Sequence, residues 1–310
     1  MEKKVIKAYP ATIIIVTYNA MPWIDKCLQS VGSCPVVVVD NASTDQTLSH
    51  IQNNYANVTL LPQTHNLGFG QANNIGIRYA LDGVAEHVLL LNQDAYLVDD
   101  VLDNLISFQK SNVEYGILSP IHITANKQKL DKNFSNFMLR EKTGSFYSDY
   151  VLGNRKPAIY EVPFVNAAAW LISRKCLETV GGFDPLFFHY GEDDNYCQRV
   201  SYHGFKIGVI PNTYIIHDRA DRIYEKPEVF SESYFNEIEK KYKVVYANIN
   251  NENKIDIKTR KLKILVLKLQ LNLKFRRANQ YWRELNLIKS LKPKIERSRA
   301  VNSKIGQHYL

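Results

Sequence analysis

The sequence predicts an α/β protein with a mostly parallel sheet flanked by helices, followed by a C-terminal basic helical extension. Short runs of β-branched residues and leucine alternate with amphipathic segments between residues 12 and 94, as in strands joined by helical crossovers. Residues 254–299 carry fifteen Lys or Arg against three acidic residues, a charge of +12, whereas the whole chain carries +8. The remainder is therefore mildly acidic. We expect an α/β domain at residues 1–225 and a helical, strongly basic extension at residues 226–310.

Composition indicates a globular protein without a membrane span. With 310 residues, of which 45% are apolar, the chain can bury one large core. No run approaches the roughly 18 apolar residues that a spanning helix needs. The apolar run after the charged amino terminus is too short for a signal peptide. The four cysteines show no metal-ligand spacing, so we expect a cytoplasmic protein with reduced thiols.

The first three expected strands are short and rich in β-branched residues. They are residues 12–16 (TIIIV), 36–39 (VVVV) and 58–61 (VTLL). Pro22 suits the first turn of the helix between the first two strands. A glycine-containing loop and a helix follow the third strand at residues 66–80, but without the G-x-G-x-x-G pattern of dinucleotide-binding proteins.

Asp40 ends the second strand and has two possible roles. It can start the turn that follows, as Asp often does. However, Ser43 and Gln46 have the spacing of a helix capping box, and Asp45 suits the positive end of that helix. Because these residues already serve the turn and the helix, we favour a ligand-binding role for Asp40.

The central stretch is residues 87–94 (HVLLLNQD). Its unbroken apolar run suits a parallel strand that is covered on both faces. The run ends abruptly in polar residues, and ligands of open α/β sheets bind just outside the carboxyl ends of the strands. Asp94 can alternatively cap the next helix, but Asp99 lies closer to the first apolar residues of that helix. We therefore favour a functional role for Asp94.

The second half of the chain is less regular. Residues 124–161 show few patterns and are expected to form a long excursion near the site. Residues 162–173 look like a buried strand, and a helix is expected to start near Glu192. Two further apolar pieces, residues 206–210 and 214–217, look like strands, and the second ends at His217.

Six segments, in order, resemble bacterial family 2 glycosyltransferases, which have the GT-A fold. They are TIIIVTYN, VVVVDNASTD, NLGFGQANNIGIRYA, LLLNQDA, GGFDPLFFHYGEDDNYCQR and IIHDR. The resemblance covers roughly residues 11–219 and implies that residues 1–225 form a GT-A catalytic domain. The ordered set is specific for the family but not for the sugar.

The resemblance also implies which residues bind the nucleotide-sugar donor. Four surround its base and ribose: Thr17, Tyr18, Asn19 and Asp40. Three match positions near the donor, although a glycine turn and a polar helix face explain them nearly as well: Asn66, Gly68 and Asn73.

Asp94 matches the last acid of the family's D-x-D motif, which holds a divalent cation against the diphosphate. The first position of the motif is Asn92 here, so we count Asn92 among the donor-binding residues. His217 matches a histidine that completes the metal shell in several relatives. Mg²⁺ or Mn²⁺ suits such a set together with phosphate oxygens and water.

Glu192 and Asp193 match the family's acidic pair on the acceptor side. The resemblance implies that Asp193 is the general base and that Glu192 supports it or binds the acceptor. Two acids can also simply stabilise a helix amino terminus. Arg199 shares a helical face with Glu192 and is a candidate to hold the pair in place. Trp170 either borders the acceptor pocket or, as we favour, packs in the core.

We therefore expect an inverting glycosyltransferase that moves a sugar from a UDP- or dTDP-sugar to a glycan or lipid-linked acceptor in cell-surface polysaccharide synthesis. Rhamnosyl-, galactofuranosyl- and hexosyltransferases resemble it most. The alternatives are a sugar-nucleotide-binding protein or a nucleotidyltransferase without glycosyl transfer. The latter is disfavoured because the first strand is followed by TYNAMP and not by a glycine-rich loop with Lys or Arg.

The basic extension is expected to contact the inner membrane surface or a second subunit. In residues 258–282, a leucine-rich stripe repeats at three and four with Lys and Arg between its members: Leu262, Leu265, Val266, Leu269 and Leu273. This pattern is typical of a helix that lies on an anionic bilayer. The alternative is that the stripe packs on the catalytic domain, but we favour contact with a membrane or a partner because the basic charge is so concentrated. We expect no nucleic-acid partner, because aromatic residues are few there and no nucleic-acid-binding motif is present.

Overall fold

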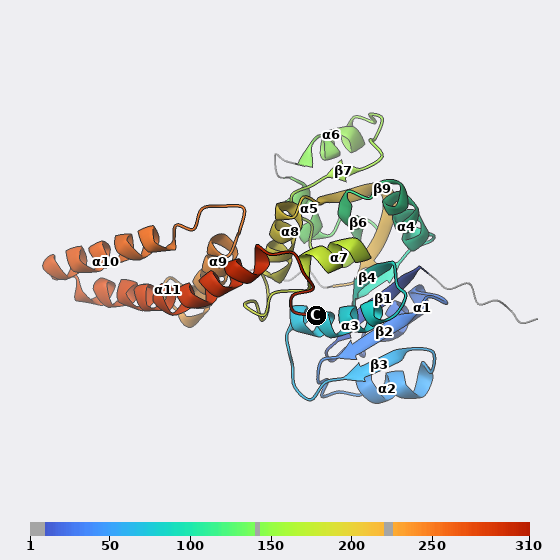
Figure 1. The fold of residues 1–310 in the computed structure, drawn as a ribbon, viewed down its shortest axis with the longest axis horizontal. Helices are drawn as coiled ribbons and strands as arrows, with labels where there is room; N and C mark the ends of the chain where they lie inside the picture. The colour runs from blue at the N-terminus through green and yellow to red at the C-terminus, as the bar shows by residue number, and fades with distance from the viewer. Residues whose placement is uncertain (1–9, 140–142, 220–225) are drawn as a thin grey trace, which may run out of the picture.

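The computed structural model describes residues 10–139, 143–219 and 226–310, and it contains one sheet between two layers of helices (Figure 1). The first half has these elements: β1 (Ala11–Thr17), α1 (Ile24–Ser30), β2 (Val36–Asp40), α2 (Thr47–Asn54), β3 (Thr59–Pro62), α3 (Phe69–Asp82), β4 (His87–Asn92), β5 (Ala95–Leu97) and α4 (Val101–Ser111). The second half continues with β6 (Tyr115–Thr124), α5 (Lys132–Met138), α6 (Phe146–Val151), β7 (Tyr160–Glu161), β8 (Ala169–Ser173), α7 (Arg174–Val180), α8 (Glu192–Tyr202) and β9 (Lys206–His217). Three helices follow: α9 (Glu232–Tyr246), α10 (Ile255–Leu271) and α11 (Phe275–Asn302).

The strands form a single sheet in the order β3-β2-β1-β4-β8-β6-β9-β5, with β7 paired to β9. The four strands β3, β2, β1 and β4 are parallel neighbours, which confirms the predicted alternation of strand and helix. β8 runs antiparallel between β4 and β6, whereas β6 and β9 are parallel. The predicted α/β class is confirmed, and its second half is mixed in direction.

Both faces of the sheet are buried, because successive side chains of a strand point to opposite faces. In β4, Val88 and Leu90 join a core that includes residues of α3, α7 and α8. Leu89 and Leu91 join a second core with residues of α1, α2 and α4. The unbroken apolar run of β4 is thus explained by burial on both sides.

Several local expectations were wrong. The hydroxyl of Ser43 donates to Asp40, while α2 begins at Thr47 without a side-chain cap from its N-cap residue Gln46. Asp99 has a φ of 51° and does not cap α4; Asp100 takes the N-cap position, also without a side-chain hydrogen bond. In both cases the turn before the helix is longer than the residue spacing predicted, so a later residue takes the N-cap position.

Two strand expectations also need correction. Residues 206–210 and 214–217 belong to one strand, β9, which has an irregular register with β6 near Asn212, whose φ is 62°. Only the end of the predicted strand at 162–173 is a strand, β8, because residues 162–168 approach the sheet as irregular chain. Pro22 lies in the turn that precedes α1.

The extension is a helical structure that projects from the sheet domain. Helices α10 and α11 pack against each other as a hairpin, and α9 packs on α11 (Figure 1). Leu262 and Val266, two residues of the predicted stripe, are only 3% and 4% exposed, and Leu262 packs in a cluster with Leu285 and Ile288 of α11. Leu262 and Val266 therefore lie inside the hairpin, whereas Leu273, the last residue of the predicted stripe, is 75% exposed at the turn after α10. None of the described helices is both long enough and apolar enough to cross a membrane.

Candidate active site

The predicted polar residues gather at one edge of the sheet. β1, β2, β4, β6 and β9 all run in the same direction, so their carboxyl ends lie together. Thr17, Asp40 and His217 are the last residues of their strands, and Asp94 follows two residues after β4. This edge is where ligands bind in α/β sheets of this kind.

Asp40 is buried, at 1% exposure, among hydroxyl groups. Its Oδ1 accepts hydrogen bonds from Thr17 Oγ1 at 2.9 Å and Ser43 Oγ at 2.6 Å, and its Oδ2 accepts from Ser43 N at 3.0 Å. The Asn19 amide N–H in turn donates to Ser43 Oγ at 3.0 Å. The Asp40 carboxylate thus joins the ends of β1 and β2 and shapes the loop that carries Asn19.

Tyr18 lies beside this cluster with an exposed ring. Its backbone N–H donates to Gln93 Oε1 at 2.8 Å, and Gln93 Nε2 donates back to the Tyr18 carbonyl at 3.3 Å. Gln93 thereby links the end of β1 to the turn that carries Asp94. The sequence analysis did not single out Gln93, although it stands inside the motif.

The loop before α3 is tied to the end of β2. Asn41 Nδ2 donates to Asn66 Oδ1 at 2.9 Å, and Asn66 Oδ1 also accepts from Gly68 N at 2.8 Å. Gly68 has a φ of 78°, and a Cβ there would lie 2.0 Å from the Phe188 carbonyl oxygen. A glycine is therefore required where this loop meets the segment before α8.

Asn73 is buried in α3 and donates to the Phe69 carbonyl at 2.9 Å. Its neighbour Asn74 contacts a residue that is distant in the sequence. The Asn74 side chain accepts a hydrogen bond from Phe183 N at 2.7 Å and donates one to the Phe183 carbonyl at 2.8 Å. Asn74 thus clamps the segment before α8 onto α3. The sequence analysis selected Asn73 and missed Asn74.

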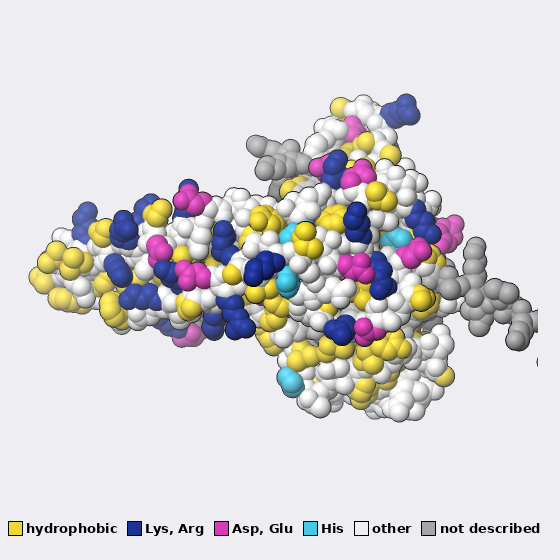
Figure 2. All heavy atoms as spheres, viewed as in Figure 1, with side chains coloured by type: hydrophobic (Ala, Val, Ile, Leu, Met, Phe, Trp, Pro, Cys, Tyr) yellow, Lys and Arg dark blue, Asp and Glu magenta, His cyan; other side chains and the backbone are white. Residues whose placement is uncertain are grey.

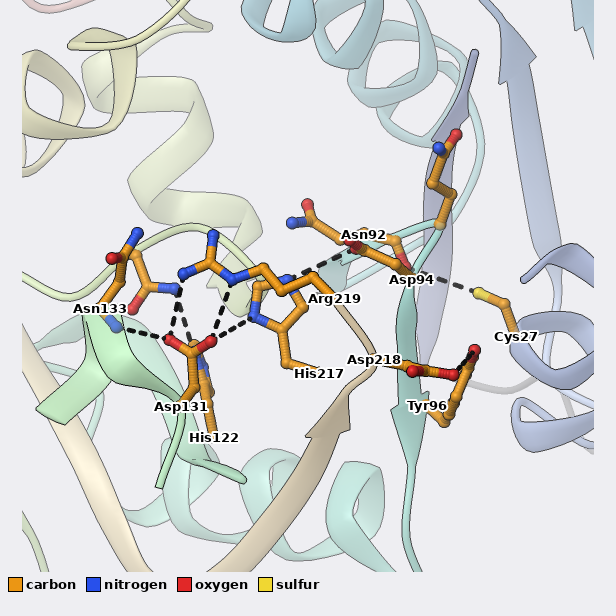
Figure 3. Close-up of polar contacts among 12 residues, drawn as sticks. Cys27, Asn92, Asp94, Tyr96, His122, Asp131, Asn133, His217, Asp218 and Arg219 are labelled. Atoms are coloured by element: carbon orange, nitrogen blue, oxygen red, sulfur yellow. Dashed lines mark hydrogen bonds and ion pairs between the residues drawn. The ribbon is translucent and has the colours of Figure 1, made fainter. Parts of the chain in front are cut away.

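Asp94 and His217 face each other, as predicted. His217 Nε2 lies 3.4 Å from Asp94 Oδ1, and its Nδ1 lies 3.4 Å from Asp131 Oδ2 on the other side of the ring (Figure 3). His217 is almost fully buried. Although burial opposes its charged form, the carboxylates of Asp131 and Asp94 outweigh that effect and raise the pKa of His217.

Asp131 is a site residue that the sequence analysis missed. It is the N-cap of α5, where it accepts from the amides of Asn133 and Phe134, and Arg219 Nε lies 3.0 Å from its carboxylate. Burial favours its neutral form, but contact with His217 and these donors prevails and lowers its pKa. Little in the sequence indicated a role for Asp131, which lies directly before a short helix in the irregular residues 124–161.

The side-chain atoms of Asp94 and His217 that face each other are suitable ligands for a divalent cation. A carboxylate oxygen and an imidazole nitrogen stand together, and Asp131 holds the far nitrogen of the ring, as carboxylates often do for metal-binding histidines. Within the described ranges, however, no group of three or more His, Cys, Asp or Glu forms a ready-made metal cluster. A cation bound between Asp94 and His217 would therefore take its additional ligands from bound substrate and water.

Glu192 and Asp193 begin α8, as predicted. A short turn joins α8 to the amino end of β9, so the start of α8 lies toward the same sheet edge. Asp193 is partly buried. Burial and the negative charges of Asp194 and Glu192 raise the pKa of Asp193 to about 7. Burial also raises the pKa of Glu192.

Two side chains beside Asp193 are poised for a ligand. Glu192 Oε2 and the Asn195 side-chain amide are buried, and neither has a hydrogen-bond partner in the described part of the protein. A buried polar group without a partner is unfavourable, so a bound hydroxyl group would satisfy them. Asn195, which the sequence analysis did not select, is therefore a candidate contact.

Arg199 does not hold the acidic pair. It is fully buried and donates from Nη1 to the Gly182 carbonyl at 2.7 Å and from Nη2 to the Val180 carbonyl. It fixes the chain before α8 and not the acids themselves. Trp170 is fully buried and stacks on Phe183, which confirms its place in the core.

The chain belongs to glycosyl transferase family 2. The model of that family matches residues 12–181, which is more than half of the chain and includes the ends of β1, β2 and β4. The family expectation from the sequence is confirmed.

Several characterised relatives are transferases of rhamnose or hexose. The chain is 28% identical over 192 residues to the dTDP-rhamnosyl transferase RfbF of Shigella flexneri, covering 61% of this chain and 62% of RfbF. It is 25% identical over 233 residues to N-acetylglucosaminyl-diphospho-decaprenol L-rhamnosyltransferase of Mycobacterium tuberculosis, covering 67% and 76%. It is 28% identical over 213 residues to the low-salt glycan biosynthesis hexosyltransferase Agl10 of Haloferax volcanii, covering 67% of each. The match thus spans less than two thirds of RfbF.

Solved structures confirm the GT-A fold. Residues 1–349 of S. aureus TarS, in complex with UDP-GlcNAc, match with a TM-score of 0.53 at 16% identity over 95% of this chain and 88% of that one. The mannosyltransferase PcManGT of Pyrobaculum calidifontis, in complex with GDP-Man and Mn²⁺, matches with a TM-score of 0.52 at 20% identity over 78% and 63%.

Proposed function

We propose that this protein is an inverting glycosyltransferase that moves a sugar from a nucleoside-diphosphate sugar to a glycan or lipid-linked acceptor. The observation that carries the proposal is that a cation-type pair, Asp94 with His217, and an acidic pair at the start of α8 lie at one sheet edge of a family 2 chain. The relatives named above, two rhamnosyltransferases and a hexosyltransferase of glycan biosynthesis, support a role in cell-surface polysaccharide assembly.

The donor is proposed to be a UDP- or dTDP-sugar at the ends of β1 and β2. Tyr18 offers an exposed ring on which a base can stack. Asn19, whose loop is held through Ser43 by Asp40, provides polar groups near the ribose. Because Asp40 is buried and already accepts three hydrogen bonds, we assign it mainly to shaping this loop.

Asp193 is proposed to be the general base. A sugar hydroxyl is a weak nucleophile at neutral pH, and a carboxylate with a pKa of about 7 is well matched to removing its proton. The hydroxyl oxygen then attacks the anomeric carbon opposite the departing diphosphate, so the configuration inverts. Glu192 and Asn195 bind and orient the acceptor through their unpaired buried atoms.

Asp94 and His217 are proposed to hold Mg²⁺ or Mn²⁺, with Asn92 nearby. The cation would neutralise negative charge on the diphosphate leaving group. Asp131 orients the His217 ring for this purpose and Arg219 holds Asp131. We place the protein in the cytoplasm, at the inner face of the membrane, where a lipid-linked acceptor would be presented.

Incubation of the purified protein with UDP- and dTDP-sugars, with and without a glycan acceptor, tests the function. We expect acceptor-dependent release of nucleoside diphosphate and an inverted anomeric configuration by proton NMR. Donor binding without release would identify a sugar-nucleotide-binding protein. Formation of a nucleotide-sugar from a sugar phosphate and a nucleoside triphosphate would identify a nucleotidyltransferase.

A further inference from the structure

We propose that the α10–α11 hairpin docks on an anionic lipid bilayer through the outer face of α10 and the turn at its tip. This inference rests on the proposed use of a lipid-linked acceptor. We call the six residues concerned the hairpin surface, and their side chains are 47% to 76% exposed: Ile257, Ile264, Leu267, Leu271, Leu273 and Phe275. They differ from the buried residues of the predicted stripe, which lie inside the hairpin.

Helical geometry places the members of this set that belong to α10 on one side of that helix, and the other two lie at the tip of the hairpin. Ile257, Ile264 and Leu271 are spaced by seven residues, which is close to two turns of an α-helix. Leu262 and Val266 point the opposite way, into α11. α10 therefore has two apolar faces, of which one packs on α11 and the other remains uncovered.

The exposed face is rich in positive charge. Arg260, Lys261 and Lys268 fall on the same side of the helix as Ile264, and the only acid of α10, Asp256, pairs with Lys292 of α11. Lys274, Arg276 and Arg277 surround the tip and are exposed. In the described part of the protein, these six basic residues form no ion pair.

Apolar side chains between unpaired basic residues fit the interface of an anionic bilayer. The apolar groups enter the boundary between headgroups and acyl chains, and Lys and Arg remain at the level of the phosphates. Figure 2 shows hydrophobic side chains at the far end of the hairpin and Lys and Arg behind them. The hairpin projects beyond the sheet domain, so its tip can reach a surface without obstruction (Figure 1).

A second copy of the chain fits this face less well. Pairing two copies through the hairpin surface would bring two like-charged faces together, because residues 254–299 carry +12. Repulsion between them opposes a dimer, whereas anionic lipid attracts each face. The positive charge of the hairpin surface therefore favours an anionic bilayer over a second copy of the chain.

Vesicle co-sedimentation of the full-length protein tests the inference. We expect binding to equimolar phosphatidylglycerol–phosphatidylcholine vesicles at low salt, weaker binding at high salt, and little binding to phosphatidylcholine alone. The double variant Ile264→Asp/Leu271→Asp should bind at least about tenfold more weakly, since it places charge in the headgroup boundary. Lys261→Glu/Lys268→Glu should weaken binding by about 25-fold or more, at about fivefold for each lysine removed.

Matched controls use exposed residues of the sheet domain. Val84→Asp/Val113→Asp and Lys129→Glu/Lys175→Glu change exposed apolar and basic side chains by the same charge away from the hairpin, and should leave vesicle binding unchanged. Equal losses in variants and controls would overturn the inference, because only net charge would then matter. It would also be overturned if light scattering showed that Ile264→Asp/Leu271→Asp converts a dimer to a monomer while vesicle binding persists.

The proposed glycosyl transfer is measured separately, with a short soluble acceptor and no vesicles. We expect both hairpin variants to retain that activity, since the hairpin surface lies outside the site. Loss of vesicle binding with intact transfer supports the docking surface. Wild-type transfer without any vesicle binding would refute the docking surface while leaving the proposed function in place.

Discussion

Replacing Asp193 by Asn tests the proposed general base directly. The substitution keeps the size and polarity of the side chain but removes its ability to accept the proton. Proton transfer to a positioned base typically contributes about 10²–10⁴-fold, so kcat should fall by that factor. Affinity for the donor should remain near the wild-type value, because the predicted donor contacts lie at the ends of β1, β2 and β4.

The pH dependence of kcat gives a second and more specific test of Asp193. Burial and the charges of Asp194 and Glu192 raise the pKa of Asp193 to about 7. About nine tenths of the side chain is then ionised at about pH 8 and about one tenth at about pH 6, so wild-type kcat should change by about tenfold between them. Residual kcat of the Asn variant should lack this change. Steady-state kinetics across this range measures both.

Stability separates a chemical effect from a structural one. The folded-state pKa of Asp193 lies above its ordinary value of 3.8, so this group contributes stability at low pH that is lost as pH rises through about 7. An asparagine side chain does not titrate. Asp193→Asn should therefore gain stability relative to wild type as pH rises from the ordinary pKa of 3.8 to the folded-state pKa of about 7. Thermal denaturation at several pH values measures the difference.

Asp194→Asn is the matched control in the same helical turn. It removes a neighbouring negative charge, so it should keep kcat at high pH and move the kinetic midpoint to lower pH. The assignment of Asp193 fails if Asp193→Asn keeps wild-type kcat. It also fails if that variant loses donor binding in parallel with activity, or if wild-type kcat does not respond to pH in this range.

Three further predictions test the rest of the site. EDTA should abolish transfer, with Mn²⁺ or Mg²⁺ restoring it, and Asp94→Ala should weaken Mn²⁺ binding measured by calorimetry with nucleoside diphosphate present; full activity in chelator would exclude the metal role. Gly68→Ala should lower stability by more than about 1 kcal/mol, and more than Gly153→Ala, which shares a positive φ but has open space; equal thermal shifts would show that the contact with Phe188 is unimportant. Glu192→Gln should raise KM for the acceptor more than it lowers kcat, and a loss of kcat as large as that of Asp193→Asn would reverse their roles.

The sheet and the residues at its strand ends were predictable because both depend on local sequence. An unbroken apolar run followed abruptly by polar residues marks a strand and its carboxyl end, and this pattern located Asp40 and Asp94. The structure then brings the two ends to one edge because β2, β1 and β4 are parallel neighbours. The acidic start of α8 was predictable for a similar reason, since acids are favoured at a helix amino terminus.

The remaining site residues depend on contacts between segments that are distant in the sequence. Asp131 reaches His217 from a remote part of the chain, on a short helix whose surroundings show no clear periodicity. Asn73 was selected because it matches a family position near the donor, and that match does not indicate that the adjacent Asn74 contacts the segment before α8. Arg199 shares a helical face with Glu192, yet its guanidinium reaches the carbonyls of Val180 and Gly182.

The extension shows the same limit in another form. Periodicity located an apolar stripe through Leu262 and Val266 but not its partner, and the structure shows that the partner is α11. With leucine or isoleucine at so many positions, α10 also has a second apolar line through Ile257, Ile264 and Leu271. Once the first line is buried, the second becomes the one that can meet another surface, and the unpaired lysines and arginines beside it determine that this surface should be anionic.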